Sequence, residues 1–299
     1  MLNIIKFSTI IFFIFLCAPL YAAKPSVIYT DAVTVVFEEP LRSAAVQVAD
    51  IYPTIKQDLE KIFHWSVDFQ PTVVLIQERQ HFQMIAGTDV IVAFAVPQKN
   101  TMVIDYSSMH TTPFTLDTTL KHELCHLLLH HHIDKVNLPK WLDEGVSQWA
   151  SDGIAEVIMD YNRSILPQAI LSGRYYRMRA LTDRFPRDKK SLQLAYAQSK
   201  SFVDYIGREF GKGSILNLLN SLRRGLTLDT AIGENFSISF ADLEKRWLDH
   251  MRKKTTWFTY LTIHTYEILF CLGAIVVIVG FVRLVIKKRT YKDIDEEEG

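Results

Sequence analysis

The run Lys121-His122-Glu123-Leu124-Cys125-His126 sets the expected architecture of this chain. Residues four apart in a helix project from one face, so both imidazoles of this run can reach a single metal ion. Glu123 stands between them and is close enough to act on a water bound to that ion. The pattern H-E-x-x-H therefore predicts a zinc-binding helix that carries its own general base.

The residues around this run favour a buried helix without interruption. Leu120, Leu124, Leu127 and Leu128 form an apolar stripe at helical spacing, and neither proline nor glycine breaks it. Cys125 falls off the face that carries the histidines, so we interpret it as a small core residue and not as a ligand or nucleophile.

A catalytic zinc usually has three protein ligands and one open position, which leaves a third ligand to find. Glu144 is one candidate, because it follows Pro139, where a second helix would begin, and the intervening chain is long enough to turn back. His132 is the other, since it stands where the pattern H-E-x-x-H-x-x-G-x-x-H has its last histidine. That pattern needs a glycine where this chain has Leu129, and a leucine favours a continuing helix that would carry His132 away.

The first motif and the later Trp141-Leu142-Asp143-Glu144-Gly145 together resemble the gluzincin metallopeptidases, especially the peptidase MA-like group. The resemblance covers about residues 30–253 and is specific at these two motifs. It implies that His122, His126 and Glu144 hold one zinc per chain, with Glu123 as general base and proton shuttle.

Two further site residues are candidates. Related gluzincins often place a tyrosine on a later helix over the zinc, so the resemblance makes Tyr196 a candidate donor to the oxyanion. An ordinary packed aromatic side chain explains Tyr196 equally well. Gln148, one turn beyond Glu144, is a candidate hydrogen-bond partner of a ligand histidine.

The resemblance implies a zinc-dependent hydrolase that acts on a peptide or protein substrate. Aminopeptidases of this clan carry a G-x-M-E-N motif that holds the substrate's free amine, and Gly87-Thr88-Asp89-Val90 lacks it, so we expect an endopeptidase. The alternative is a noncatalytic, membrane-anchored module that uses zinc for stability and its cleft for binding or assembly. Glu123 favours catalysis, because a structural zinc site needs no base. A net charge of 0 gives no electrostatic reason to expect nucleic acid.

Both ends of the chain indicate export and membrane anchoring. Residues 1–22 have the charge pattern and apolar run of a signal peptide, followed by an exported catalytic domain at 23–257. Residues 258–286 predict one transmembrane helix, in which the unbroken apolar run 268–282 has aromatic residues before it and basic residues after it. The basic side marks the cytoplasm, so we expect residues 287–299 to be a short cytoplasmic tail, in which residues 291–299 are too few and too charged to fold.

The remaining pattern predicts an α+β fold, with a small mixed sheet near the N-terminus packed on a mainly helical lobe that carries the zinc site. The expected strands are short β-branched runs, and the last two would form a hairpin. They are residues 33–37, 72–76, 91–96 and 101–105. An amphipathic helix over residues 48–62 lies between the first two, with Pro53 as a weak point. Cys125 is the one cysteine of the expected exported domain, so stability must come from packing and the metal.

Overall fold

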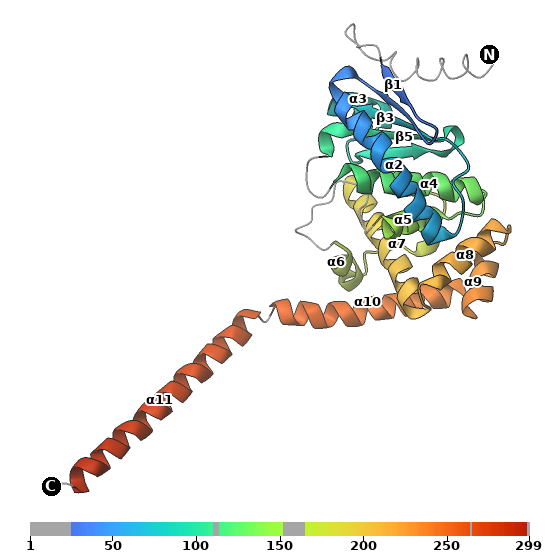
Figure 1. The fold of residues 1–299 in the computed structure, drawn as a ribbon. Coiled ribbons are helices and arrows are strands. Elements are labelled where there is room, and N and C mark those ends of the chain that lie inside the picture. Colours follow the sequence, from blue (N-terminus) through green and yellow to red (C-terminus); the bar gives the residue numbers. More distant parts are fainter. Residues whose placement is uncertain (1–24, 110–113, 152–164, 264, 298–299) are drawn as a thin grey trace, which may run out of the picture. The chain divides into compact units, whose positions relative to one another are not determined.

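The computed structural model describes residues 25–109, 114–151, 165–263 and 265–297 (Figure 1). The predicted signal peptide lies outside these ranges. The chain divides into two compact units, Met1–Trp247 and Leu248–Gly299.

A five-stranded mixed sheet forms the N-terminal part of the first unit, in the order β1-β2-β3-β5-β4. The two outer pairs, β1 with β2 and β4 with β5, are antiparallel, whereas the inner pairs are parallel. The strands are β1 Ser26–Tyr29, β2 Thr34–Phe37, β3 Thr72–Ile76, β4 Ala93–Val96 and β5 Thr101–Asp105. Strand β4 is therefore an edge of the sheet, and β5 is an interior strand.

The predicted hairpin is present, with Val96 paired to Thr101 across the turn. Asn100 takes a left-handed conformation there, with φ of 47°, which asparagine tolerates better than most residues. Strand β4 begins two residues later than predicted. Strand β1 was not predicted, and three of its four residues are only partly buried.

The sheet is covered on both faces, which explains its continuous β-branched runs. Val36, Val74 and Val103 lie in register on one face and pack with Phe82 of α3, Arg79–Ala86. The residues that alternate with them point to the opposite face and are also fully buried. Helices α2 and α4 pack against the strands as well.

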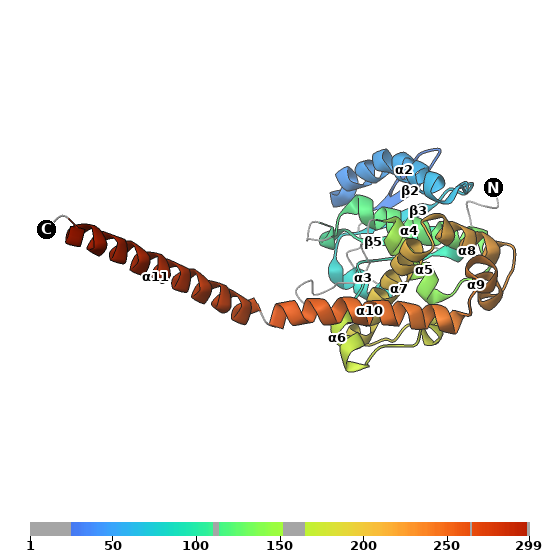
Figure 2. The same ribbon diagram turned by 90° about the horizontal axis from the view of Figure 1, so that it is seen from below.

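Helix α2 runs from Arg42 to Phe63 without a break, although Pro53 lies inside it. Helix α4, Leu116–His132, contains the first motif, and the side chain of Thr115 caps its N-terminus by accepting a hydrogen bond from the backbone N–H of Thr118. Helix α4 contacts the sheet on one side and α5 on another, and α5 in turn packs on α7, an order that can be followed in Figures 1 and 2.

The rest of the described first unit is helical, which confirms the predicted α+β class. The α-helices are α5 Lys140–Ala150, α6 Ile165–Ser172, α7 Lys189–Glu209, α8 Gly213–Arg223 and α9 Leu228–Phe236. Short 3₁₀ helices are η1 Glu39–Leu41, η2 Pro97–Lys99, η3 Tyr106–Ser108 and η4 Met178–Leu181.

Two long helices, α10 Phe240–Ile263 and α11 Thr265–Glu297, complete the described chain. Among the described residues, one segment is long and apolar enough to cross a membrane, Thr265–Leu284 in α11. The prediction of an unstructured segment was wrong for residues 291–297, because α11 continues to Glu297. No proline or glycine interrupts residues 287–297, and their lysine and glutamate residues are good helix formers.

Candidate metal centre

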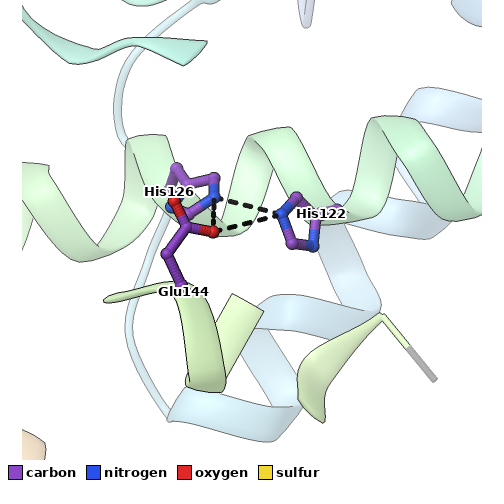
Figure 3. A group of neighbouring side chains, drawn as sticks. All are labelled: His122, His126 and Glu144. Carbon is purple, nitrogen blue, oxygen red and sulfur yellow. Dashed lines mark hydrogen bonds and ion pairs between the residues drawn. The ribbon is translucent and has the colours of Figure 1, made fainter. Parts of the chain in front are cut away.

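Three side chains from two helices converge at one buried point (Figure 3). His122 and His126 come from α4, and Glu144 reaches toward both from α5. One donor atom of each residue lies within 4.8 Å of the others. The Nε2 atoms of the two histidines are 3.1 Å apart, and Glu144 Oε2 lies 3.5 Å from His126 Nε2 and 3.9 Å from His122 Nε2.

The local sequence explains why the two helices meet here. The spacing of four residues puts both imidazoles on one face of α4. Pro139 serves as the N-cap of α5, and the backbone N–H of Lys140 donates to Thr182 O at 2.6 Å, which fixes where α5 begins. Gly145 lets α5 approach α7 closely, because a Cβ at this position would lie 2.6 Å from Ser199 O. The glycine of the second motif thus has a packing role beside the ligand.

Each histidine is oriented by a partner on its other ring nitrogen. His126 Nδ1 donates to Asp143 Oδ1 at 2.6 Å. His122 Nδ1 lies 3.3 Å from Ser151 Oγ, whose own proton is donated to Ser147 O at 2.7 Å. Ser151 therefore accepts from His122. With both Nδ1 atoms acting as donors, the Nε2 lone pairs are left to face the cluster, as metal ligation requires.

Glu144 is held by one of its two oxygens. Lys140 Nζ lies 2.6 Å from Oε1, and the Tyr196 hydroxyl donates to the same oxygen at 3.2 Å. Oε2 is buried and makes no hydrogen bond with any residue that the structure describes. A buried carboxylate oxygen without a donor is unfavourable unless a cation is present, so this atom and the two Nε2 atoms fit a zinc ion.

Burial and the neighbouring charges shift the pKa of all three side chains of the cluster. Burial and the neighbouring His126 lower the pKa of His122 to about 3, so it is neutral near pH 7. Burial favours protonation of Glu144, but the charges of Lys140 and His126 outweigh it and lower the pKa of this carboxyl to about 2. Burial opposes charge on His126, yet Asp143 and Glu144 raise its pKa well above the usual value. The surroundings therefore stabilise a positive charge at this point.

The other predicted site residues have defined places. Tyr196, on α7, combines the packing and polar interpretations, since its ring lies edge-on to Phe185 with centroids 5.3 Å apart while its hydroxyl reaches Glu144. Glu123 is fully buried on α4. The prediction for Gln148 was wrong, because its amide donates to the backbone carbonyls of Glu144 and Tyr196 and not to a histidine.

The second candidate for the third ligand, His132, is not in the cluster. Helix α4 continues past Leu129, and His132 Nε2 donates to Ser66 O at 2.9 Å while its ring packs on Trp65. His130 is nearer, with Nε2 3.1 Å from Asp143 Oδ2. Cys125 is fully buried, in agreement with a core role.

Three residues that contact the cluster were not predicted from the sequence, namely Lys140, Ser151 and Asp143. Asp143 makes the most contacts with the histidines. It bridges His126 and His130 through its two oxygens and is itself buried. The second motif offered a signal, because a metal-binding histidine commonly donates its other ring N–H to a carboxylate and Asp143 stands beside Glu144.

A small cavity opens at the cluster between the edge of the sheet and the two motif helices. It has a volume of about 130 Å³. Phe94 and Ala95 of β4 and Pro97 line one side, and His126 and Glu144 lie on the other side. We call this the inner cavity. It gives a small molecule or peptide group access to the cluster from the sheet edge.

The fold and the donor set define a gluzincin-like domain. The family model described as the Peptidase MA superfamily matches residues 71–253, more than half of the chain, and the chain belongs to this superfamily. No curated protein sequence matches it.

Two similar solved structures are of a variant M1 zinc metallopeptidase from Deinococcus radiodurans, one of them bound to a Tyr-Ser-Ala substrate. The first has 13% identity and a TM-score of 0.41, covering 75% of this chain and 52% of that chain. The second has 12% identity and the same TM-score, covering 75% and 51%. The chain thus spans about half the length of the solved structures it matches.

Proposed function

We propose that this protein is a membrane-anchored, extracytoplasmic zinc metallopeptidase, and an endopeptidase in preference to an aminopeptidase. The observation that carries the proposal is the buried convergence of His122, His126 and Glu144, with one oxygen of Glu144 left without a donor. Membership of the Peptidase MA superfamily supports the same class of reaction.

In the proposed site, His122, His126 and Glu144 hold one zinc ion per chain. When bound, zinc supplies Lewis acidity and lowers the pKa of a water molecule towards about 7. Asp143 and Ser151 fix the ring orientations of the two histidines, and Lys140 and Tyr196 fix the carboxylate of Glu144. The chain thus preorganises the ligands before the metal binds.

Glu123 is the proposed general base. Its carboxylate takes the proton of the attacking water and passes it to the amine that leaves. Tyr196 is the proposed donor to the oxygen that becomes negative during attack, and its hydroxyl lies 3.2 Å from Glu144 Oε1, beside the proposed ligand set.

Strand β4 is the proposed binding edge for extended substrate. It is the edge strand nearest the cluster, and its residues Phe94 and Ala95 line the inner cavity. A peptide added as a further strand would be held by backbone hydrogen bonds with little dependence on sequence. Such binding suits cleavage within a chain, in line with the missing amine-binding motif near Gly87.

Anchoring is proposed from α11, whose apolar side chains are exposed along Thr265–Leu284. Together with a signal peptide at residues 1–22 and the basic residues after the span, it would place a catalytic domain, residues 23–257, outside the cytoplasm. In this proposal the tail, residues 287–299, is cytoplasmic.

The test uses the full-length chain in a non-ionic detergent, wild type beside Glu123→Gln. We expect both proteins to bind zinc, and only the wild type to cleave a mixture of unstructured peptides, with activity lower by about 10²–10⁴-fold in the variant. Mass spectrometry of the products distinguishes internal from N-terminal cleavage. Zinc in both proteins and no cleavage by either would favour the noncatalytic binding or assembly module.

A further inference from the structure

A second, larger cavity continues from the inner cavity and is not explained by the proposed chemistry. It has a volume of about 740 Å³ and shares Pro97, His130, Lys140 and Asp143 with the inner cavity. We call it the outer cavity. Pro97 directly follows β4, so a substrate strand laid along β4 towards Pro97 would pass from the inner cavity into the outer one.

The charged side chains of the outer cavity are mainly basic. Lys135 and Arg184 line it, are exposed, and make no ion pair with any residue in the described ranges. Of the two carboxylates in its wall, Asp143 is buried and already engaged by His126 and His130. Asp183 is the other, and it is exposed. Lys135 and Arg184 thus outnumber Asp183, the exposed carboxylate in the wall of the outer cavity.

The neighbouring chain strengthens this excess of positive charge. Residues 183–190 read Asp-Arg-Phe-Pro-Arg-Asp-Lys-Lys, with four basic and two acidic side chains, in a protein whose 33 basic and 33 acidic residues balance. Asp188 is also committed locally, because its side chain caps α7 by accepting from Ser191 N. A positive local potential attracts anionic ligands and disfavours cationic ones.

Lys140 connects the two cavities. Its ammonium group lines both and pairs with Glu144 Oε1, so a negative group entering the outer cavity meets Lys140 within the same wall that holds the metal cluster. The backbone hydrogen bond from Lys140 to Thr182 O ties this wall to the segment that carries Arg184. The backbone that carries Arg184 is therefore held next to the helix that carries Glu144.

We propose that the outer cavity binds a carboxylate of the substrate through Lys135 and Arg184, so that the protein selects peptides with an acidic group close to the scissile bond. This inference rests on the proposed peptidase function. The carboxylate is an Asp or Glu side chain or the C-terminus of a short peptide, since both present the same anionic group to two cations.

The test measures binding separately from cleavage. Full-length Glu123→Gln, loaded with zinc in detergent, is titrated into fluorescein-labelled alanine-based peptides that differ at one scanned position, Glu, Gln or Lys, and end in an amide or a free carboxylate. Fluorescence anisotropy gives Kd for each peptide. We expect the best-placed Glu to bind roughly three- to tenfold more tightly than Gln, and the difference to shrink at high salt.

Charge reversal supplies the matched variants. Lys135→Glu combined with Arg184→Glu should abolish the preference for Glu and improve binding of the Lys peptide. Lys212→Glu, at an exposed position at the start of α8 and outside both cavities, should leave the preference unchanged. If only the peptides with a free C-terminus bind more tightly, the terminal carboxylate is the ligand.

Equal Kd values for the Glu and Gln peptides, no binding of the Glu peptide, or a preference that survives the double reversal would overturn the inference. Cleavage of the same peptides by the wild type reports on the proposed function independently. Cleavage without a charge preference would contradict the carboxylate site and leave the peptidase proposal standing. A charge-dependent Kd without any cleavage would contradict the peptidase proposal and leave the carboxylate site standing.

Discussion

Helices α4 and α11 both carry several leucines and one cysteine each, yet the apolar side chains are buried in α4 and exposed in α11. In α4, Leu124 has none of its surface exposed and even its charged Glu123 is fully buried. In α11, Val277 is 70% exposed and Phe270 is 78% exposed. The first helix is buried within its unit, and the described apolar side chains of the second are exposed in theirs.

The difference in burial suits the two helices to different roles. Burial in α4 removes water from the two histidines proposed as ligands and makes each of their hydrogen bonds stronger and more selective. The exposed apolar surface of α11 is unfavourable in water and fits a lipid environment, where its backbone hydrogen bonds are satisfied within the helix. Substitutions in the motif helices should therefore alter the folded domain, and matched substitutions in α11 should not.

The largest expected effect comes from a cavity in α4. Leu124→Ala should lower the free energy of unfolding by about 2–5 kcal/mol, because the surrounding core cannot fill the space. Val277→Ala removes a similar apolar group from an exposed position and should leave the free energy of unfolding unchanged. Urea denaturation of the full-length chain in detergent, followed by tryptophan fluorescence, compares them. Equal losses of unfolding free energy in the two variants would contradict the difference in burial between α4 and α11.

Asp143→Asn tests the buried hydrogen bonds of the two motif helices. The amide keeps the shape of the side chain but loses the charge that orients and polarises His126. Zinc affinity should fall about 10–100-fold. Competition with a chelator of known affinity measures it, and Asp183→Asn, at an exposed position, is the control. An unchanged zinc affinity would mean that Asp143 does not tune the ligand.

Gly145→Ala should destabilise the first unit by about 1–3 kcal/mol, because the added methyl group would lie 2.6 Å from Ser199 O and push α5 away from α7. Gly273→Ala in α11 meets no atom within 4 Å among the described residues and should be neutral. Thermal unfolding of both variants gives the comparison. A stabilising Gly145→Ala would show that helix propensity outweighs the close approach.

The smallest effect concerns thiol reactivity. Burial raises the pKa of the Cys125 thiol to about 12, so little thiolate forms at pH 8 and the group should resist alkylation until the domain unfolds. Cys271 is exposed and should react with a small apolar maleimide in detergent. In lipid vesicles, a charged maleimide should label neither residue. Rapid labelling of Cys125 in the folded protein would contradict its burial.

Sequence patterns predicted the fold where one local signal was strong. Strands Thr72–Ile76 and Thr101–Asp105 have the predicted limits, because their β-branched runs are buried on both faces. The short, partly buried β1 lacks that signal. Pro53 leaves α2 unbroken because tertiary packing overrides a local weak point.

The candidate metal centre also has some features with a local sequence signal and some without one. The spacing within the first motif placed His122 and His126 on one face, and the family resemblance carried by the second motif favoured Glu144 over His132 as the third member of the cluster. The hydrogen bond of Ser151 to His122, across 29 residues, depends on how α5 lies against α4 and has no local signature. Gln148 was assigned wrongly for the same reason, since helical phase alone did not reveal which neighbour its amide faces.

The direct test of the proposed metal centre is to measure zinc content after dialysis in full-length wild type, Glu144→Ala and His132→Ala. We predict one zinc per chain in the wild type and in His132→Ala, and loss of most of it in Glu144→Ala. Full zinc in Glu144→Ala together with its loss in His132→Ala would contradict the proposed metal centre.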